Sequence, residues 1–463
     1  MTRRIGLIGL GTMGRALALN LRDHGLEVIG FDSEDEARAA FVAAGAGLAP
    51  SSLPDLIAAL PSPRVVLILV PAGAAVDRVM DALRPLLAAG DVVADCGNSH
   101  YGETVRRCRS WAVTGLHWLG VGVSGGESGA RHGPAMMAGG GSEALDRIEP
   151  LLAPSAAMSG AGRCFGRFGG AGAGHFVKMV HNGIEYAEMQ LIAEACLVLR
   201  RHLGLSAAAT AALFAEWAAG DQGSYLLEIS AAILAEIDTD SGKPLLDLVA
   251  DAAEQKGTGH WTVTAAAELG VAAPTIAAAV NARLLSAALT DRAQVRDRLA
   301  PVSPAGSDCE VAQVGEALLA ARLCAFAQGI AVLRAARRAF GWDLDPAEAV
   351  RVWSGGCIIR TRLLAPLAEA MAGGGEGVNL LALSPVAGRL ATADAGWRRV
   401  VAAAAFGGLP VPALASALAY RDGLASARPG TELIQAQRDC FGAHGYGRID
   451  RPGRFHSTWG VEP

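Results

Sequence analysis

The chain has 463 residues, of which 51% are hydrophobic and 18% are charged. This length and apolar content suffice for two or three packed domains and exclude a disordered chain. The formal net charge of -5 excludes a broad basic surface for nucleic acid, although local Lys and Arg clusters can still bind an anionic small molecule.

The cysteines are scattered along the chain without a Cys-x-x-Cys pair or a spacing typical of metal ligands. They are Cys96, Cys108, Cys164, Cys196, Cys309, Cys324, Cys357 and Cys440. This usage predicts reduced thiols in a cytoplasmic protein and no structural metal site.

Short β-rich runs alternate with helix-length segments in the first third of the chain. The runs are Ile5–Ile8, Glu27–Phe31, Val65–Val70, Val92–Asp95 and Trp118–Val123. Strands separated by helical segments predict βαβ units and a parallel sheet. We therefore expect an α/β domain here.

A glycine pattern follows the first of these strands and opens a helix. It reads Gly9-Leu10-Gly11-Thr12-Met13-Gly14. In this context the first glycine permits a tight turn, the second lets the backbone approach a pyrophosphate, and the third lets the helix pack on the strand. The positive end of the helix then faces the pyrophosphate. The pattern predicts a dinucleotide-binding domain of the Rossmann type over residues 1–174.

An aspartate, Asp32, ends the second strand at about 20 residues after this pattern begins. A carboxylate at this position accepts hydrogen bonds from the ribose hydroxyls of NAD and repels the 2′-phosphate of NADP. An aspartate after a strand can instead serve only to form a turn. The position favours the cofactor role.

Polar side chains recur at helical spacing in the segment from Lys178 to Tyr186. The stripe consists of Lys178, His181, Asn182, Glu185 and Tyr186. The residues between them are mostly apolar, which predicts a helix buried on its other sides, and Lys and Glu are seldom buried unless they are paired or functional. Gly183 in the middle indicates a close approach by another part of the protein. The alternative is a solvated helix face.

Long Ala- and Leu-rich segments with helical periodicity predict an all-α domain over residues 175–428. A weak internal duplication is indicated by two short matches. Leu197–Arg200 resembles Ala331–Arg334, and Trp217–Gly220 resembles Trp353–Gly356.

The run Val400–Tyr420 carries no charge and has the length of a membrane span. Because Gly407, Gly408, Pro410 and Pro412 interrupt it, we expect a buried helix and turn instead, and no membrane partner. The last segment, 429–463, is rich in Gly, Arg and aromatic residues and lacks a core-facing periodicity. It is therefore expected to drape over another surface or to be disordered.

Four further motifs carry a resemblance to a known family. They are Val121-Gly-Val-Ser124-Gly125-Gly126-Glu127, the Lys178–Tyr186 segment, Lys256-Gly-Thr258-Gly-His-Trp-Thr262 and Leu433-Ile-Gln-Ala-Gln-Arg438-Asp-Cys-Phe-Gly-Ala-His444. With the dinucleotide pattern and the helical second domain, the chain resembles the 6-phosphogluconate dehydrogenases (decarboxylating), enzymes of the pentose phosphate pathway, along essentially its whole length.

The resemblance implies a set of binding residues. Those for a sugar acid phosphate are Asn98, Ser124, Gly125, Gly126, His181, Asn182, Tyr186, Lys256, Thr258, Arg283, Arg438 and His444. Those for the cofactor are Gly9, Leu10, Gly11, Thr12, Met13, Gly14, Asp32, Ser33, Val70, Ala72 and Asn98. In the family Arg438 and His444 come from the partner's C-terminal tail, so the resemblance implies a homodimer that exchanges its tails.

The resemblance also implies a mechanism with two catalytic residues and no metal. Lys178 is the general base on the C3 hydroxyl while hydride leaves C3, and Glu185 protonates C1 of the enediol formed by loss of CO2. Burial moves the pKa of a lysine down and that of a glutamate up, which suits a base and an acid that work at one pH.

The chain departs from the family in the cofactor loops. NADP-dependent members typically have Asn-Arg-Ser or Asn-Arg-Thr after the second strand, where this chain has Asp32-Ser33-Glu34-Asp35. A family lysine is replaced by Pro71. These changes predict NAD as the cofactor, preferred over NADP. Ala135, Ala138 and Cys96 are smaller departures near the site.

Two alternatives remain on the sequence alone. One is a β-hydroxyacid dehydrogenase that oxidises another small or phosphorylated hydroxy acid, in which the anion-binding residues of the tail are superfluous. The other is a catalytically silent NAD-binding scaffold, which the fold alone allows. Lys178 and Glu185 together argue against the scaffold.

Overall fold

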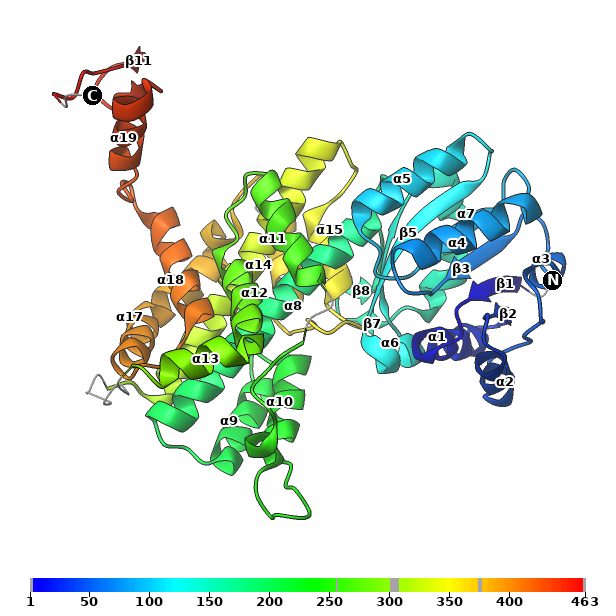
Figure 1. Ribbon diagram of the computed structural model, residues 1–463, viewed down its shortest axis with the longest axis horizontal. Coiled ribbons are helices and arrows are strands. Elements are labelled where there is room, and N and C mark those ends of the chain that lie inside the picture. Colours follow the sequence, from blue (N-terminus) through cyan, green and yellow to red (C-terminus); the bar gives the residue numbers. More distant parts are fainter. Residues whose placement is uncertain (1–2, 255–256, 300–307, 374–376, 461–463) are drawn as a thin grey trace. The chain divides into compact units, whose positions relative to one another are not determined.

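The computed structural model describes residues 3–254, 257–299, 308–373 and 377–460. The chain divides into two compact units, Met1–Ala417 and Leu418–Pro463. The larger unit contains an α/β part, blue to cyan in Figure 1, and a helical part, green to orange.

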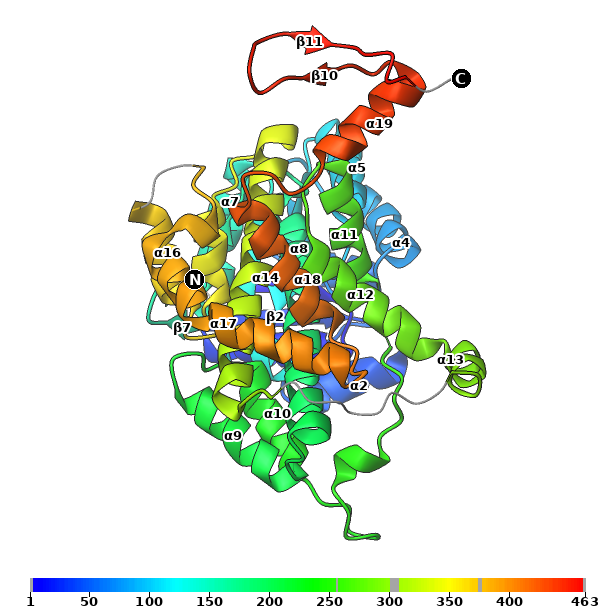
Figure 2. The same ribbon diagram turned by 90° about the vertical axis from the view of Figure 1, so that its left-hand side faces the viewer.

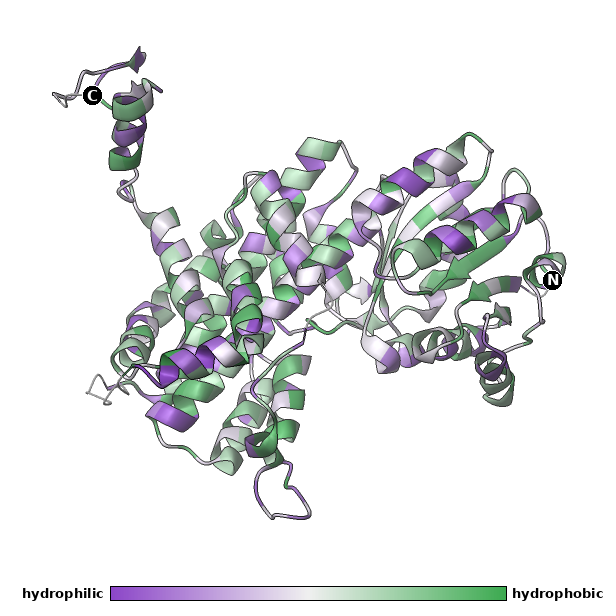
Figure 3. Cartoon of the chain, viewed as in Figure 1, coloured by the Kyte–Doolittle hydropathy of each residue, from purple (hydrophilic) through white to green (hydrophobic). Residues whose placement is uncertain are grey.

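The α/β part is built on a seven-stranded sheet of order β2-β1-β3-β4-β5-β6-β9. The strands are β1 (Arg3–Ile8), β2 (Leu26–Phe31), β3 (Val65–Ile68), β4 (Val92–Asp95), β5 (His117–Ser124), β6 (Ala135–Gly139) and β9 (Phe165–Arg167). All five predicted strands are present, and β1 to β5 pair in parallel. The strand β3, Val-Val-Leu-Ile, is hydrophobic along its length (Figure 3). A strand buried on both faces requires this composition.

The sheet is not wholly parallel, which the alternation of strands and helices did not predict. β6 runs antiparallel to β5, and only the short helix α6 (Gly126–His132) lies between them. A parallel connection needs a dozen or more residues, so this short link fixes the antiparallel direction. A small hairpin of β7 (Met158–Ser159) and β8 (Gly162–Arg163) precedes β9.

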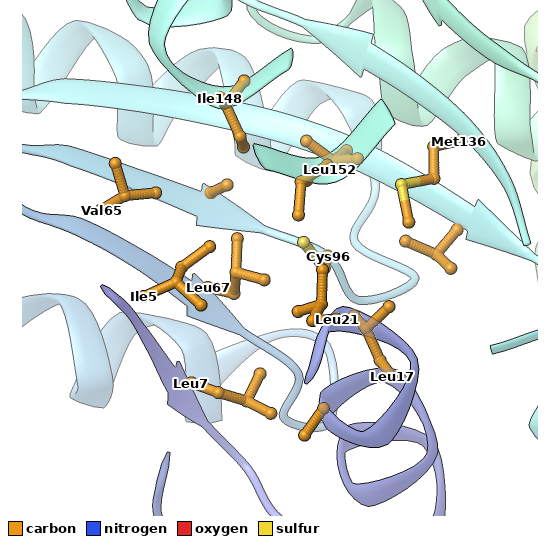
Figure 4. Packing of buried hydrophobic residues seen from close by; sticks show 14 of the residues in the cluster. Ile5, Leu7, Leu17, Leu21, Val65, Leu67, Cys96, Met136, Ile148 and Leu152 are labelled. Carbon is orange, nitrogen blue, oxygen red and sulfur yellow. The ribbon is translucent and has the colours of Figure 1, made fainter. Parts of the chain in front are cut away.

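Helices cover both faces of the sheet, and each face has its own hydrophobic core. On one face α1 (Thr12–Asp23), α2 (Asp35–Ala43) and α7 (Ser142–Leu152) contribute to a cluster that includes Leu17 and Ile148 (Figure 4). On the other face α3 (Leu53–Ala58), α4 (Ala74–Leu83) and α5 (Tyr101–Ala112) contribute Leu56, Met80 and Trp111. This arrangement is the predicted Rossmann-type architecture.

The rest of the larger unit is helical, as predicted. Its helices are α8 (Ala173–Leu197), α9 (Ala207–Ala219), α10 (Tyr225–Ala235), α11 (Thr258–Glu268), α12 (Pro274–Ala287), α13 (Leu289–Arg296), α14 (Val311–Phe340), α15 (Pro346–Trp353), α16 (Leu364–Gly373) and α17 (Ser384–Phe406), followed by α18 (Pro412–Ala425). The long helices α8 and α14 pack side by side, with α17 against α14 (Figure 2). A fully buried ion pair joins them, because Arg322 Nε of α14 lies 2.8 Å from the Glu188 carboxylate of α8.

Within the described residues, one helix, α14, is long and apolar enough to cross a membrane by length and composition, and 83% of its most apolar stretch is buried inside the protein. That degree of burial is typical of a core helix. The run Val400–Tyr420 forms the end of α17, a turn and the start of α18, as predicted from its glycines and prolines. In the first repeated pair, Leu197–Arg200 begins at the last residue of α8 and Ala331–Arg334 lies within α14. In the second pair, Trp217–Gly220 and Trp353–Gly356 extend past the ends of α9 and α15. The duplication stays a prediction.

The smaller unit is more ordered than its sequence indicates. It contains α19 (Glu432–Gly442) and a hairpin of β10 (Tyr446–Gly447) and β11 (Arg454–Phe455). These elements gather around Asp439, whose carboxylate accepts hydrogen bonds from Gly445 N, His456 Nδ1, Ser457 N and Trp459 Nε1 at 2.7 to 3.0 Å. Burial alone would raise the pKa of Asp439, but these hydrogen bonds hold it below its usual range. A buried carboxylate thus takes the place of a hydrophobic core.

Candidate active site

The polar stripe predicted from the sequence lies on one face of α8, against the end of β5. Lys178 Nζ donates to Asn182 Oδ1 at 2.5 Å and to Ser124 Oγ at 3.2 Å, and His181 Nε2 lies 3.1 Å from Ser124 Oγ. The helix approaches the strand this closely because glycines face it. A Cβ at Gly122 would lie 2.3 Å from Lys178 Cβ. A lysine, an imidazole, an amide and a hydroxyl therefore converge at one point.

Burial determines the protonation behaviour of the lysine. Lys178 is 8% exposed, and the pKa of its amine is lowered by desolvation, against which the negative charge of Glu185 acts. A lower pKa increases the neutral fraction of an amine, which is the form that accepts a proton. The arrangement suits a general base.

The pKa of Glu185 is shifted in the opposite direction. Burial raises the pKa of this carboxyl, although Lys178 and Arg283 partly oppose the shift. The carboxylate lies 3.7 Å from His181 Nδ1, and burial lowers the pKa of His181 well below its ordinary value, so the imidazole is neutral. A buried amine and a largely covered carboxyl, 22% exposed, with converging pKa values are suited to serve as base and acid at one pH.

The glycine within the stripe has the close contact that the sequence predicted. A Cβ at Gly183 would lie 2.6 Å from a methyl carbon of Thr262 in α11, whose hydroxyl donates to the Met179 carbonyl at 2.8 Å. At the start of α11, Thr258 is buried near this contact. The glycine therefore allows α11 to pack directly on α8.

An arginine extends the stripe away from the lysine. The guanidinium carbon of Arg283, in α12, lies 3.6 Å from the centroid of the Tyr186 ring, a cation–π distance. Its Nη1 also lies 3.5 Å from the Glu254 carbonyl. Arg283 is thus held at the far end of the row that begins at Lys178.

The loop after β5 has the backbone conformation that only glycine adopts readily. Gly125 has φ 122° and Gly126 has φ 62°. A Cβ at Gly125 would lie 2.4 Å from the Gly356 carbonyl oxygen, so the loop after α15 packs on it. In that second loop burial raises the pKa of the Cys357 thiol to about 12, which keeps it protonated.

Asn98 lies on the turn after β4, which a buried polar network holds in place. The Asp95 carboxylate accepts from Ser99 Oγ at 2.5 Å and from Gly97 N at 3.0 Å. Arg107, fully buried in α5, donates to Asp77 at 2.9 and 3.0 Å and to the Gly73 carbonyl at 3.1 Å. Because its Nη1 also lies 3.4 Å from Ser99 Oγ, Arg107 joins the turn that carries Asn98 to the loop that carries Val70 and Ala72.

The glycine pattern fits a dinucleotide pyrophosphate. Gly9 has φ 98°, and a Cβ there would lie 2.3 Å from the Leu69 carbonyl oxygen, while a Cβ at Gly14 would lie 2.0 Å from the Gly9 carbonyl oxygen. A Cβ at Gly11 would instead enter open space, which is the approach a pyrophosphate needs. The first amides of α1 have no side-chain cap and remain available as donors.

A cavity of about 430 Å³ lies between α1 and α6. It is lined by Thr12, Arg15, Ala16, Leu19, Glu127, Ser128, Arg131 and His132. Thr12 from the glycine pattern and Glu127 from the first turn of α6 therefore face one space.

Three predicted binding residues are not part of this arrangement. Lys256 lies outside the described residues. Arg438 and His444 belong to the smaller unit, where Arg438 Nη1 lies 3.3 Å from Gln435 Oε1 and the His444 ring lies 5.9 Å from that of Phe441. Both side chains belong to exposed residues of that unit.

The residues that support the site were not predicted from the sequence. The Asp95–Arg107–Asp77 network and the Gly356–Cys357 loop are separated from the stripe in the sequence and carry no motif that we interpreted. Arg107 stands between Arg106 and Arg109 in a polar helix, so no local pattern in the sequence distinguishes it as the buried arginine.

The glycine loop that follows β1 suits a pyrophosphate, and α8 brings Lys178 and Glu185 to the carboxyl end of β5 in the same Rossmann-type sheet. Together they define a nicotinamide-dependent dehydrogenase. Comparison with known proteins gives the family. The dinucleotide part, residues 4–169, matches the "NAD binding domain of 6-phosphogluconate dehydrogenase", and residues 174–459 match the "6-phosphogluconate dehydrogenase, C-terminal domain". The chain belongs to the 6-phosphogluconate dehydrogenase family.

Relatives align over almost the whole chain. The decarboxylating 6-phosphogluconate dehydrogenase of Synechococcus elongatus is 42% identical, with 99% of each chain covered. The NADP(+)-dependent decarboxylating enzyme of Bacillus subtilis is 40% identical, again over 99% of each chain. The structure of the Plasmodium falciparum enzyme superimposes with a TM-score of 0.94 at 33% identity, covering 98% of this chain and 100% of that one. The prediction of an oxidoreductase of this family is confirmed, against the silent scaffold.

The prediction of NAD as the cofactor is wrong. The Bacillus subtilis relative is named NADP(+)-dependent, and the Plasmodium falciparum enzyme was solved in complex with NADP+. The error lay in counting acids as unpaired charges. Asp32 Oδ2 accepts from Leu10 N at 2.8 Å and Oδ1 from Glu34 N at 3.1 Å, and Asp35 pairs with Arg38. Two backbone amides therefore offset the negative charge of Asp32, and Arg38 offsets that of Asp35.

Proposed function

We propose that the protein catalyses the oxidative decarboxylation of 6-phospho-D-gluconate to D-ribulose 5-phosphate and CO2 with NADP+ as the acceptor, in the pentose phosphate pathway. The observation that carries the proposal is the buried Lys178, beside Ser124, on the same helix face as the partly exposed Glu185, with their pKa values shifted toward each other. Family membership and the names of the relatives support the same substrate.

The oxidation step uses Lys178 as the base. NADP+, when bound at the glycine loop, accepts the hydride that leaves C3 of the substrate. The neutral amine takes the proton of the C3 hydroxyl at the same time, and Asn182 and Ser124 orient it through their hydrogen bonds to Nζ. His181 hydrogen-bonds to the same Ser124 hydroxyl, and its lowered pKa keeps a second positive charge away from Lys178.

Decarboxylation and protonation follow at the same place. The β-keto acid releases CO2 because the C3 carbonyl accepts the electron pair of the breaking C1–C2 bond, and protonated Lys178 donates a proton to that oxygen. The product is an enediol. Glu185, protonated through its raised pKa, then delivers a proton to the former C2, which becomes C1 of ribulose 5-phosphate.

We assign the phosphate and the carboxylate of the substrate to polar and charged residues around this stripe. Arg283 and Thr258 lie toward the Tyr186 end of α8 and suit the phosphate, together with Lys256. Asn98 and the Ser124–Gly126 loop suit the carboxylate end and the hydroxyls near Lys178. Gly9–Gly14, Val70 and Ala72 hold the cofactor.

We further propose a cytoplasmic homodimer in which Arg438 and His444 complete the phosphate site of the partner. Large exposed hydrophobic side chains support association, since such surfaces are rarely left bare. In the larger unit they include Leu284, Leu285, Leu289 and Val295, and in the smaller unit Leu433, Ile434 and Phe441. In this proposal residues 1–174 form the cofactor-binding domain and residues 175–428 form the domain that binds substrate and dimerises. Residues 429–463 form the tail that is exchanged between subunits.

The direct test is an assay of the purified protein with 6-phosphogluconate and NADP+, following NADPH by absorbance and released CO2 together. Equal amounts of both are expected. Gluconate and 3-hydroxyisobutyrate serve as comparison substrates, because a β-hydroxyacid dehydrogenase does not need the phosphate. NADPH without CO2, or equal kcat/KM on a substrate lacking the phosphate, would contradict the proposal.

A further inference from the structure

The loop after β2 poses a problem for a protein that uses NADP+. The 2′-phosphate of this cofactor lies beside the ribose position that Asp32 marks, and an arginine near that position normally accommodates it. The loop itself, Asp32-Ser33-Glu34-Asp35, contains three acids and no cation. The positive charge has to come from another element.

Arg38 in the first turns of α2 supplies a positive charge at this place. Its Nη1 donates to the Asp32 carbonyl at 2.6 Å and lies 3.3 Å from the Ser33 carbonyl, while Nη2 pairs with the Asp35 carboxylate. The guanidinium carbon lies 5.9 Å from the centroid of the Phe31 ring. Backbone carbonyls therefore fix the guanidinium against the loop, so little of its conformational freedom remains to be lost on binding a ligand.

The two carboxylates nearest Arg38 differ in how firmly they are held. Asp32 is bound through both oxygens to backbone amides of the glycine loop and its own turn. Asp35 is 89% exposed and contacts the arginine at a surface position. The Arg38 side chain is 15% exposed, so solvent reaches the pair mainly through Asp35. A phosphate dianion can therefore replace Asp35 on Nη2 while the Asp35 carboxylate returns to water.

We propose that Arg38 is the residue that binds the 2′-phosphate of NADP+, from helix α2 rather than from the loop after β2, with the exposed Ser33 hydroxyl as a second donor. This inference rests on the proposed use of NADP+. It makes Arg38 the residue that determines cofactor specificity and assigns to Asp35 the role of a counter-ion when no phosphate is bound.

The test measures binding of two adenosine ligands that differ only in the phosphate concerned. Adenosine 2′,5′-bisphosphate and 5′-AMP are titrated calorimetrically into the full-length protein. Arg38→Ala should weaken bisphosphate binding by about tenfold or more, as expected for loss of a charged hydrogen bond, and leave 5′-AMP binding within about twofold. The matched control is Arg3→Ala, because Arg3 lies at the opposite end of β1 and contacts the Pro150 carbonyl.

A second variant tests the same inference without removing the arginine. Asp35→Asn removes the competing carboxylate, so bisphosphate binding should tighten by roughly threefold or more, with 5′-AMP binding unchanged. This variant decides the question if Arg38→Ala does not fold. A wild-type protein that binds both ligands equally, an Arg38→Ala protein that loses both equally, or an Asp35→Asn protein with an unchanged ratio would overturn the inference.

The outcome is separable from that of the proposed function. If the protein does not oxidise 6-phosphogluconate but its bisphosphate affinity depends on Arg38, the inference stands and the proposed reaction is wrong. If the reaction occurs with NADP+ and Arg38→Ala keeps the wild-type kcat/KM and bisphosphate affinity, the inference alone is wrong.

Discussion

At the scale of single residues, the chemistry depends on an amine that is neutral when substrate binds. Lys178→Met keeps most of the side-chain volume and removes the base. We expect kcat to fall by about 10²–10⁴-fold, with KM little changed because the phosphate contacts remain. Steady-state kinetics with NADP+ measures both. Lys243→Met is the control, since Lys243 lies in an exposed turn, and near-normal turnover of the Lys178 variant would show that another group is the base.

The carboxyl partner acts after hydride transfer and therefore predicts a different kinetic signature. Glu185→Gln cannot deliver the last proton, so protonation of the enediol should limit turnover and the deuterium isotope effect from substrate labelled at C3 should shrink toward unity. An isotope effect that grows would place Glu185 in the earlier step. Glu216→Gln, on the exposed face of α9, is the matched control and should keep the wild-type isotope effect.

At the scale of elements, periodicity and glycine positions predicted most of what positions the site. The five strands, the helix that carries Lys178 and the close contact at Gly183 follow from patterns within a few residues of each other. The antiparallel β6 does not, because its direction depends on the short connection through α6. Arg38 was not predicted for a similar reason. It belongs to α2, and its guanidinium lies at the Asp32 carbonyl only because the helix folds beside the loop after β2.

A buried glutamate on α8 links two elements that are far apart in the sequence. Glu194 is almost fully buried and accepts from Ala413 N at 2.9 Å and Leu414 N at 2.8 Å, at the start of α18. Burial raises the pKa of Glu194 to about 7, although these amides and Gln190 oppose the shift. No local pattern indicates this cap, because more than two hundred residues separate the partners.

The raised pKa makes stability depend on pH. Between about 4.5 and 7 the folded protein keeps a proton on Glu194 that the unfolded chain releases, so the free energy of unfolding falls as pH rises through this window. Glu194→Gln retains an acceptor oxygen for one of the two amides and removes the titration, so its pH dependence, and not its absolute stability, is the quantity compared. From pH 4.5 to pH 8 the variant should gain on the order of 3 kcal/mol relative to wild type. Urea unfolding at both pH values measures the difference, and parallel behaviour of the two proteins would contradict the assignment.

At the scale of the whole molecule, the tail belongs to a separate small unit in which Arg438 and His444 are exposed. Its internal order depends on Asp439, whereas the Arg438 side chain lies at the surface with Nη1 3.3 Å from Gln435 Oε1. Arg438→Ala should therefore leave the unit folded. This separates a loss of activity from a loss of structure, which deletion of residues 430–463 cannot do.

Exchange of tails between subunits predicts that two inactive proteins restore activity when mixed. Lys178→Met lacks the base but has an intact tail, and Arg438→Ala has the base but lacks the phosphate ligand. After subunit exchange, a mixed dimer contains one site with Lys178 from one chain and Arg438 from the other, and a second site with neither. Random exchange of equal amounts makes about half of the dimers mixed, so about a quarter of the wild-type sites should be active.

Mixing Lys178→Met with Arg448→Ala, a tail variant whose arginine pairs with Asp450, reports the activity and exchange expected when the tail cation is intact. Exchange is verified by mass spectrometry of isotope-labelled chains. Verified exchange without any recovery in the first mixture would place Arg438 in the site of its own subunit.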